Sequence, residues 1–510
     1  MRIIIQRELN MDIISRKHRV LTVFLLLVLT ACNSDDKPQS VPEELVDNLD
    51  STLNALIETH GLTGNHFSGR DIPDVNSNIV QLGKHLFFSK SLGGNRDSAC
   101  VSCHHPMLGG GDNLSLPIGV DAQLPDLLGL GREHDTNSPT YDGGPTVPRN
   151  APTTFNIGGW DQFMFHDGRV ESMGKTTGKN GNDGIGIRTP DSRFGIADPK
   201  AGSSLTQAQA RFPVTSNEEM KGFNHLTKNN QEIRDYLAGR IGGYSEAETE
   251  LSDHAFWLEK FKEAFGQPNA NSEQLITEQN ISFAIAQYEL SQVFTDTPWL
   301  HYIEGDISAL TDSAKRGAIL FYQSQDQGGA NCVLCHSGDF FTDEQFHNVA
   351  APQLGNGKGD GNSGHEDFGR FRETNLQSDM FAFRTPSLLN VVNTGPWMHS
   401  GAYVELIDVV KHSVNAKQSI ESYHNIVLNQ PGIQNLATVS IFTQKAINSE
   451  NFEGGMLDLN EQNIDDLVEF LHALSDPCVT DRECMMPWLL VDDEGQDPNG
   501  DQVIAIDQDG

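Results

Sequence analysis

Two C-x-x-C-H motifs constrain this chain more than any other feature of its sequence. The first motif, C-V-S-C-H, covers residues 100–104, and the second, C-V-L-C-H, covers residues 332–336. Two thiols at this spacing can form thioether bonds to the vinyl groups of a haem, and the adjacent imidazole can then reach the iron. A thioredoxin-like site would need a βαβ context, and a zinc ribbon would need paired knuckles. We therefore predict two covalent haems c, attached and ligated by Cys100, Cys103, His104, Cys332, Cys335 and His336.

The N-terminal residues have the pattern of a bacterial export signal. A basic cluster at residues 16–19 precedes the apolar run 20–30, which is too short to span a bilayer. The sequence L-T-A-C then fits a lipobox, in which Cys32 is lipidated; an ordinary signal peptide with a chance cysteine is the alternative. We expect a lipoprotein signal peptide over 1–31, a polar tether over 32–46, and a periplasmic or cell-surface protein anchored to the outer membrane.

The other cysteines and the charge fit an exported protein that does not bind nucleic acid. Cys478 and Cys484 remain as a pair, which we expect to form a small disulfide, since a zinc site would need two further ligands. The 70 acidic residues outnumber the 35 basic ones, which gives a formal net charge of −35. Binding to a phosphate backbone needs a basic surface, so this composition argues against nucleic acid as a partner.

Hydrophobic periodicity favours a mainly α fold. Helical spacing is clear over residues 281–288, after Thr277, and over residues 464–471, after Asn460. Long β-type alternation is nearly absent. We predict two cytochrome c-like helical domains, each with one covalent haem, joined by long Gly-rich loops and meeting near residues 265–275. The predicted units are an N-terminal haem domain (47–270), a C-terminal haem domain (271–477) and an acidic tail (478–510).

Several sequence blocks resemble the bacterial di-haem cytochrome c peroxidases and the related MauG-like enzymes. These blocks are G-K-H-L-F-F (83–88), R-N-A-P-T (149–153), F-H-D-G-R (165–169), P-V-T-S-N-E-E-M (213–220), F-R-T-P-S-L (383–388) and P-W-M-H-S-G (396–401). The resemblance runs in order from about residue 75 to 475. It implies an oxidoreductase that uses hydrogen peroxide at an open first haem, in the N-terminal domain. Electrons would pass through the second haem from a small periplasmic donor protein or an oxidisable partner protein.

The alternative is a di-haem electron-transfer cytochrome without peroxidase activity. The resemblance implies two features at the first haem that argue against a pure electron-transfer cytochrome. The family's distal histidine is replaced by Val120, and no histidine follows until His134, so haem 1 is expected to be five-coordinate as in the MauG-like branch. Protein oxidation is then favoured over peroxide detoxification. His105, next to the proximal ligand, is expected to be a surface residue.

The second feature is a carboxylate that the resemblance places in the distal pocket. Glu219 aligns with the family's distal glutamate, with Glu218 as the competing neighbour. A carboxylate in a mostly apolar pocket has a raised pKa and can shuttle one proton during peroxide cleavage. Gln209 and Pro213 are expected to line the same pocket.

The resemblance also indicates residues between the haems and at the second iron. The family's inter-haem tryptophan is replaced here by His166, and Trp160 either substitutes for it or belongs to the core. The sixth ligand of haem 2 is expected on the helix over 405–413. An ungapped register puts Ser413 there, but its neighbour His412 is a better ligand and is preferred, with Met398 as the alternative. Two further histidines, His347 and His399, are expected to contact the haem or its ligands.

Calcium is the last cofactor that the resemblance implies. The family holds the ion at the domain interface with one asparagine side chain and two backbone carbonyls, which match Asn150, Thr394 and Pro396. The acidic run 493–501 also resembles a calcium loop. It lacks the glutamate at the twelfth position of an EF-hand, so a solvated acidic tail is preferred.

Overall fold

The computed structural model describes residues 43–491 and 497–503. The predicted signal peptide, Cys32 and the tether up to residue 42 lie outside the described residues, as do residues 493–496 of the acidic run. None of the described helices is both long enough and apolar enough to cross a bilayer.

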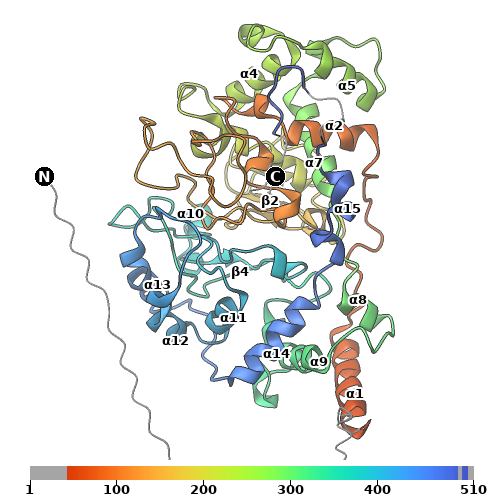
Figure 1. Ribbon diagram of the computed structural model, residues 1–510, viewed down its shortest axis with the longest axis vertical. Coiled ribbons are helices and arrows are strands. Elements are labelled where there is room, and N and C mark those ends of the chain that lie inside the picture. The colour runs from red at the N-terminus through yellow and green to blue at the C-terminus, as the bar shows by residue number, and fades with distance from the viewer. Residues whose placement is uncertain (1–42, 492–496, 504–510) are drawn as a thin grey trace, which may run out of the picture.

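The described chain is mainly helical, as the sequence predicts. Its α-helices are α1 (Glu43–His60), α2 (Asn78–Phe87), α3 (Leu205–Ala210), α4 (Asn230–Gly242), α5 (Ala255–Phe265), α6 (Ser272–Leu275), α7 (Glu278–Leu290), α8 (Pro298–Ile303), α9 (Asp312–Tyr322), α10 (Phe371–Thr374), α11 (Leu406–Val414), α12 (Ala416–Glu421), α13 (Val439–Ile447), α14 (Glu461–His472) and α15 (Arg482–Met485). Long irregular segments connect these helices and carry both haem motifs (Figure 1).

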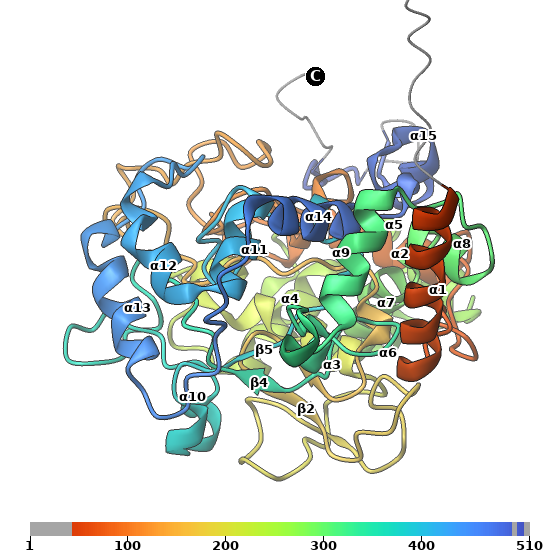
Figure 2. The same ribbon diagram turned by 90° about the horizontal axis from the view of Figure 1, so that it is seen from below.

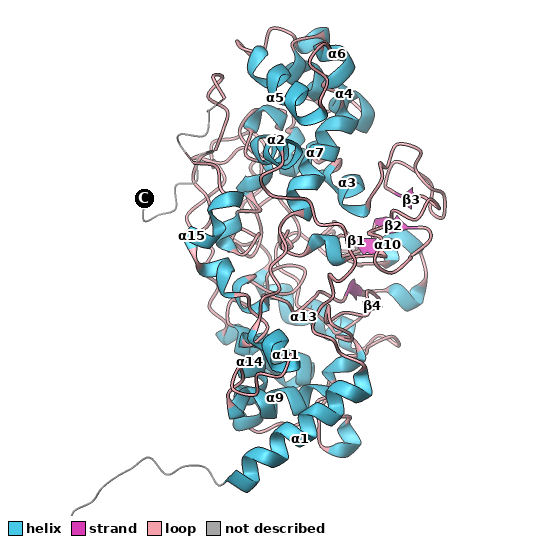
Figure 3. Ribbon diagram, turned by 90° about the vertical axis from the view of Figure 1, so that its right-hand side faces the viewer, coloured by secondary structure: helices cyan, strands magenta, loops and turns pink. Residues whose placement is uncertain are grey.

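Short antiparallel strands lie in the middle of the molecule. Strands β1 (Phe163–Met164), β2 (Val170–Ser172) and β3 (Ile187–Arg188) form one sheet, and β4 (Phe346–His347) pairs with β5 (Phe383–Arg384). In the first sheet Glu171 is opposite Phe163 on one side and Arg188 on the other. Figure 3 shows the strands between two groups of helices, one at each end of the molecule.

Helices α2 and α7 cross in close contact in the first hydrophobic core. The hydroxyl of Thr277 accepts a hydrogen bond from the Asn280 amide at 3.2 Å and caps α7, which confirms the predicted start. Gly83 permits the crossing, because a Cβ at this position would lie 2.0 Å from the carbonyl oxygen of Ala284. Buried side chains of the two helices in this core are Val80, Leu82, Leu86, Phe87, Ile281, Ala284, Ile285 and Tyr288.

Helices α9 and α14 repeat this arrangement in the second core. The Asn463 amide donates to the side chain of Asn460 at 2.9 Å, so α14 also begins at its predicted cap. A Cβ on Gly317 would lie 1.8 Å from the carbonyl oxygen of Asp466, so this crossing too depends on a glycine. In each half, a helix that precedes the C-x-x-C-H motif crosses a later helix of the chain.

The two ends of the described chain pack against the opposite halves. Asp50 on α1 accepts a hydrogen bond from the Tyr302 hydroxyl at 2.7 Å and pairs with Lys315 on α9 at 2.8 Å. Figures 1 and 2 both show α1 beside α9. At the other end, the Val503 amide donates to the Phe88 carbonyl at 2.8 Å, and the chain returns to the first core.

The boundaries of the cores therefore differ from the predicted domain limits. Helix α7 falls within the predicted C-terminal domain but packs in the first core. Helix α1 begins at Glu43, inside the predicted tether, continues into the predicted N-terminal domain and packs in the second core. The expectation of a solvated tail is wrong for Asp497 and for residues 501–503, which are buried. Asp501 is buried because Arg96 pairs with its carboxylate at 2.7 Å and the Ser91 hydroxyl donates to it at 2.6 Å.

Candidate active site

Each haem motif fixes its histidine through one ring nitrogen. The motifs begin in short 3₁₀ turns, and His104 Nδ1 lies 3.1 Å from the Gly110 carbonyl oxygen, while His336 Nδ1 lies 2.9 Å from that of Phe341. A backbone carbonyl that accepts a hydrogen bond from Nδ1–H keeps the ring proton on Nδ1 and leaves Nε2 as the metal-binding nitrogen. Burial lowers the pKa of both histidines, which favours the neutral, ligating form.

The predicted pairing of the last two cysteines is confirmed. Cys478 and Cys484 form a disulfide with a Cα–Cα distance of 5.3 Å. The four motif cysteines, Cys100, Cys103, Cys332 and Cys335, are not joined in disulfides. The donor set of each motif, two cysteine sulfurs and one neutral imidazole, fits a covalent haem c.

A cavity lies beside the first motif. Its volume is about 100 Å³. Apolar side chains form much of its wall, together with a few polar groups. The lining residues used below are Cys100, Cys103, His104, Arg149, Phe165, His166, Arg169, Gln209, Pro213, Glu219, Glu289 and Lys358. The cavity therefore brings the predicted proximal ligand and the predicted distal carboxylate to one site.

Glu219 enters this cavity from a single π-helical turn, Asn217–Lys221. Such turns are rare and occur frequently at functional sites. Burial raises the pKa of Glu219, although Arg169 and Lys358 act in the opposite direction. Glu218 is not among the lining residues, and its side chain accepts a hydrogen bond from Ser216 at 3.1 Å. The geometry thus favours Glu219 over its neighbour.

Gln209 and Pro213 line the cavity together with Glu219. Gln209 lies on the last turn of α3, and Pro213 begins the 3₁₀ turn that follows. The three side chains reach the cavity from one continuous segment of the chain, as the resemblance implies. Their roles in the reaction stay predictions.

The position of the missing distal histidine is packed against the glutamate turn. Val120 is fully buried, and its amide donates to the Glu218 carbonyl oxygen at 3.1 Å. Gly119 permits this contact, because a Cβ there would lie 2.5 Å from the Glu219 carbonyl oxygen. His134 is buried elsewhere, with Nδ1 3.1 Å from the Asp135 carbonyl oxygen. Neither Val120 nor His134 is among the described residues that line the cavity.

The prediction that His105 is a surface residue is wrong. Its side chain is 5 % exposed, and its Nδ1 accepts a hydrogen bond from the Met107 amide at 3.2 Å. This bond caps the 3₁₀ turn Pro106–Leu108, and the ring packs against Phe88. His105 is therefore buried because it organises the turn after the haem motif.

His166 and Trp160 have different environments. His166 lines the cavity, and its Nε2 lies 3.1 Å from the Asn150 carbonyl oxygen. Burial, followed by Arg149, lowers the pKa of His166 to about 4, so the imidazole is neutral at physiological pH. Trp160 belongs to the second core, where the Arg384 guanidinium lies 3.3 Å from the centre of its ring. A role in electron transfer stays a prediction for both residues.

Other residues of the cavity were not predicted to have a functional role. Arg149 was noted only as part of a sequence block, yet its guanidinium bridges Asp167 and Asp367, at 2.6 Å from each. Glu289 on α7 is buried, and burial raises its pKa to about 8. The available signal for Glu289 was a carboxylate one position after Tyr288, at the end of the apolar periodicity over residues 281–288.

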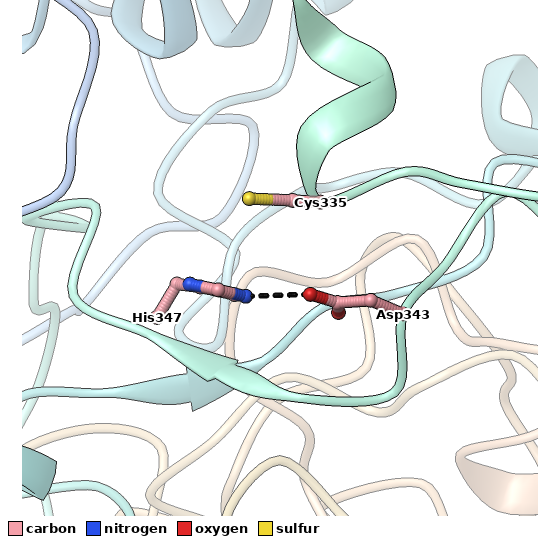
Figure 4. A group of neighbouring side chains, drawn as sticks. All are labelled: Cys335, Asp343 and His347. Atoms are coloured by element: carbon pink, nitrogen blue, oxygen red, sulfur yellow. Dashed lines mark hydrogen bonds and ion pairs between the residues drawn. The ribbon is translucent and has the colours of Figure 1, made fainter.

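The second motif lies beside a cluster of charged residues. His347 Nε2 is 2.8 Å from the Asp343 carboxylate, its Nδ1 contacts Glu453, and the Cys335 sulfur lies close to the ring (Figure 4). Hydrogen bonds to Asp343 and then to Cys335 raise the pKa of His347 to about 11. Cys335, Asp343 and His347 could together hold a metal ion. The thioether bond predicted for Cys335 would remove its thiolate from such a set.

The expected sixth ligand of haem 2 is buried and hydrogen-bonded at both ring nitrogens. His412 Nδ1 lies 2.9 Å from the Tyr403 hydroxyl, and Nε2 lies 3.0 Å from the Val349 carbonyl oxygen. Binding to iron would therefore require His412 to give up one of these partners. Ser413 is exposed, and the alternative ligand Met398 packs in a small core around Tyr403. The identity of the sixth ligand stays a prediction.

The predicted calcium ligands lie on segments that meet. The Asn150 amide donates to the His399 carbonyl oxygen at 2.9 Å, and its side-chain Nδ2 donates to that of Leu114 at 2.9 Å. His399 also stacks on Phe383. Thr394 and Pro396 lie on the same stretch as His399, in which the Gly395–Pro396 peptide bond is cis. The calcium site and the haem-contact roles of His347 and His399 stay predictions.

The chain is similar to several known proteins. The family model for di-haem cytochrome c peroxidase matches residues 77–308. The methylamine utilization protein MauG of Methylorubrum extorquens is 27 % identical over 338 residues, which are 66 % of this chain and 68 % of that protein. The cytochrome c551 peroxidase of Pseudomonas aeruginosa is 27 % identical over 343 residues, which are 66 % of this chain and 72 % of that protein.

Solved structures show the same fold. A MauG-like protein associated with microbial copper homeostasis superposes with a TM-score of 0.52 at 20 % identity, covering 82 % of this chain and 96 % of that one. A variant of the diheme peroxidase BthA from Burkholderia thailandensis gives a TM-score of 0.50 at 20 % identity, covering 80 % and 88 %.

The chain belongs to the di-haem cytochrome c peroxidase/MauG family. It is an enzyme of the cytochrome-c peroxidase type, and membership of this family implies two haems, hydrogen peroxide and an electron-donor protein.

Proposed function

We propose that this enzyme reduces hydrogen peroxide at the first haem, with electrons supplied through the second haem by a periplasmic redox protein or by an oxidisable partner protein. One observation carries this proposal: Glu219 lines the same cavity as Cys100, Cys103 and His104. Two cytochrome c-like domains, the interface calcium ion and the lipid anchor at Cys32 belong to the same proposal. Two domains are supported because the same helix crossing occurs once in each hydrophobic core, between α2 and α7 and between α9 and α14.

The residues of the cavity can supply the proton transfers of this reaction. When bound, the haem supplies the position at which peroxide binds and the electrons for its reduction. Glu219 accepts a proton from the oxygen that binds and returns it to the oxygen that leaves, so the departing group is water. The raised pKa of Glu219 suits this exchange, because the carboxylate is basic enough to take the proton and acidic enough to release it. Over the whole reaction, one peroxide, two electrons and two protons give two molecules of water.

Oxidation of a partner protein is favoured over peroxide detoxification. Val120 occupies the position of the distal histidine and has no group that can bind iron, so the first haem should react in its resting state. The His134 ring lies outside the cavity lining, with Nδ1 held 3.1 Å from a backbone carbonyl oxygen. These observations support the MauG-like branch over the branch that needs prior reduction.

Peroxide added to the oxidised, haem-loaded protein tests this function. Without any reductant, we expect an immediate change in the haem absorbance spectrum that is complete at about one equivalent of peroxide. A change that occurs only after partial reduction would assign the chain to peroxide detoxification. No change in either state would make it an electron-transfer cytochrome.

A further inference from the structure

The second half of the chain contributes a lysine to the cavity of the first haem motif. Lys358 lies on the Gly-rich loop over residues 355–369, and its side chain lines this cavity with His104 and Glu219. No periodic pattern links this loop to the first half of the sequence. The contact is a product of the fold.

The loop holds the backbone of Lys358 firmly. Its amide donates to the Glu366 carbonyl oxygen at 3.1 Å, and its carbonyl oxygen accepts from Arg372 at 3.2 Å. Asp360 and Glu366 pair as antiparallel neighbours, and the Glu366 carboxylate pairs with Lys445 at 2.6 Å. The lysine therefore starts from a fixed position at the edge of the cavity.

Lys358 differs from the other cations of the cavity because no described carboxylate pairs with its ammonium group. Arg149 pairs with Asp167 and Asp367, and Arg169 lies 3.1 Å from Asp167 with its guanidinium 3.5 Å from the ring centre of Phe165. The Lys358 ammonium makes no hydrogen bond or ion pair with any residue that the structure describes. Burial, followed by the two arginines, lowers its pKa. A partly buried, unpaired cation gains most from an anion that enters its cavity.

We propose that Lys358 is the anion-binding residue of this cavity and that it stabilises the hydroperoxide form of the substrate beside Glu219. The proposal rests on the proposed function, because it assumes that peroxide reacts at the first haem. Hydrogen peroxide loses one proton to Glu219, and the ammonium pairs with the hydroperoxide anion so formed. When the O–O bond breaks, the proton on Glu219 passes to the departing oxygen, which leaves as water. The other oxygen becomes water with two protons and the two electrons of the donor protein.

Small ligands distinguish this role from a purely structural one. The oxidised, haem-loaded protein is titrated with azide, an anion, and with imidazole, which is neutral at about pH 8. Absorbance of the first haem gives the two dissociation constants. Losing one charge-assisted hydrogen bond corresponds to a roughly ten- to hundredfold weaker affinity. Lys358→Met should weaken azide by that factor and change imidazole less than about twofold, and Lys358→Arg should keep azide binding. Lys200→Met, which removes the same charge at an exposed position, should leave both constants unchanged.

Three outcomes would overturn the proposal. Equal azide affinity in Lys358→Met and the parent would show that the ammonium does not face the ligand. If Lys358→Met shifted the midpoint potential of the first haem but left the azide affinity unchanged, Lys358 would instead pair with the haem carboxylates. Parent protein that binds neither azide nor imidazole would lack an open haem, and this result would overturn the proposed function together with the lysine.

Discussion

Replacing Glu219 by glutamine is expected to slow peroxide cleavage by about 10²- to 10⁴-fold, the range typical of a positioned acid–base group. Glutamine has nearly the same shape but cannot take a proton from peroxide. Glu219 is buried in the cavity wall, and Ser98 and Ser216 hold the backbone of its turn, so the substitution should preserve the local structure. Both haems should stay attached, since their cysteines lie on other segments. Stopped-flow absorbance after mixing with peroxide measures the rate.

The same turn offers a matched control for this prediction. Glu218→Gln removes one carboxylate from the adjacent position, whose side chain bonds to Ser216 and is not among the cavity-lining residues. It should change the rate less than about threefold. Parent-like cleavage in Glu219→Gln, or a large loss in Glu218→Gln, would show that a different group moves the proton. The parent rate should also rise with pH as Glu219 ionises, at a pH above the usual range of a glutamate.

Replacing Arg149 by methionine is expected to lower the free energy of unfolding by about 3–5 kcal/mol, the cost of leaving buried charges without their partner. The side chains of Arg149, Asp167 and Asp367 are 7 %, 3 % and 1 % exposed, so water cannot replace the guanidinium. Asp367 lies on the same loop as Lys358, so the pair of Arg149 and Asp367 also joins the two halves of the molecule. Urea unfolding of the haem-loaded protein, followed by absorbance and by tryptophan fluorescence, measures the loss.

The pH dependence of this effect has a definite sign. Burial alone would raise the pKa of Asp167 and Asp367, but Arg149 holds the pKa of both well below the usual range. Carboxylates with a lowered pKa contribute stability above their unfolded pKa of ~3.9, and this stability is lost at lower pH. The difference between parent and Arg149→Met should therefore be largest near neutral pH and shrink below about pH 4. Lys411→Met, at an exposed ion pair, should cost less than about 1 kcal/mol at any pH. If Arg149→Met also lowered the free energy of unfolding by less than about 1 kcal/mol at neutral pH, the buried ion-pair network would be contradicted.

Local signals in the sequence predicted the parts of the structure that depend on neighbouring residues. Thr277 and Asn460 cap their helices as expected, because capping involves residues only a few positions apart. The motif histidines are fixed by carbonyls five or six positions away in the chain. The resemblance placed Gln209, Pro213 and Glu219 together, and they reach one cavity since a single segment carries all three.

Contacts between distant segments could not be predicted in this way. Gly266 ends α5, as the Gly-Gln-Pro-Asn sequence indicates, but it does not determine that α7 packs with α2. The docking of Val503 on Phe88 and the entry of Lys358 into the first cavity join positions hundreds of residues apart. His105 is buried, contrary to the prediction, because its ring caps the turn after the haem motif and packs against Phe88 of the first core.

Electron paramagnetic resonance of the oxidised, haem-loaded protein at rest tests the central claim of an open first haem most directly. Val120 offers no ligand to the first iron, and His134 lies outside the cavity lining, so one haem should give a high-spin signal. The second haem, with a sixth ligand from the chain, should give a low-spin signal of equal intensity. Two low-spin signals in the resting protein would contradict the account, because a side chain would then close the site at which peroxide must bind.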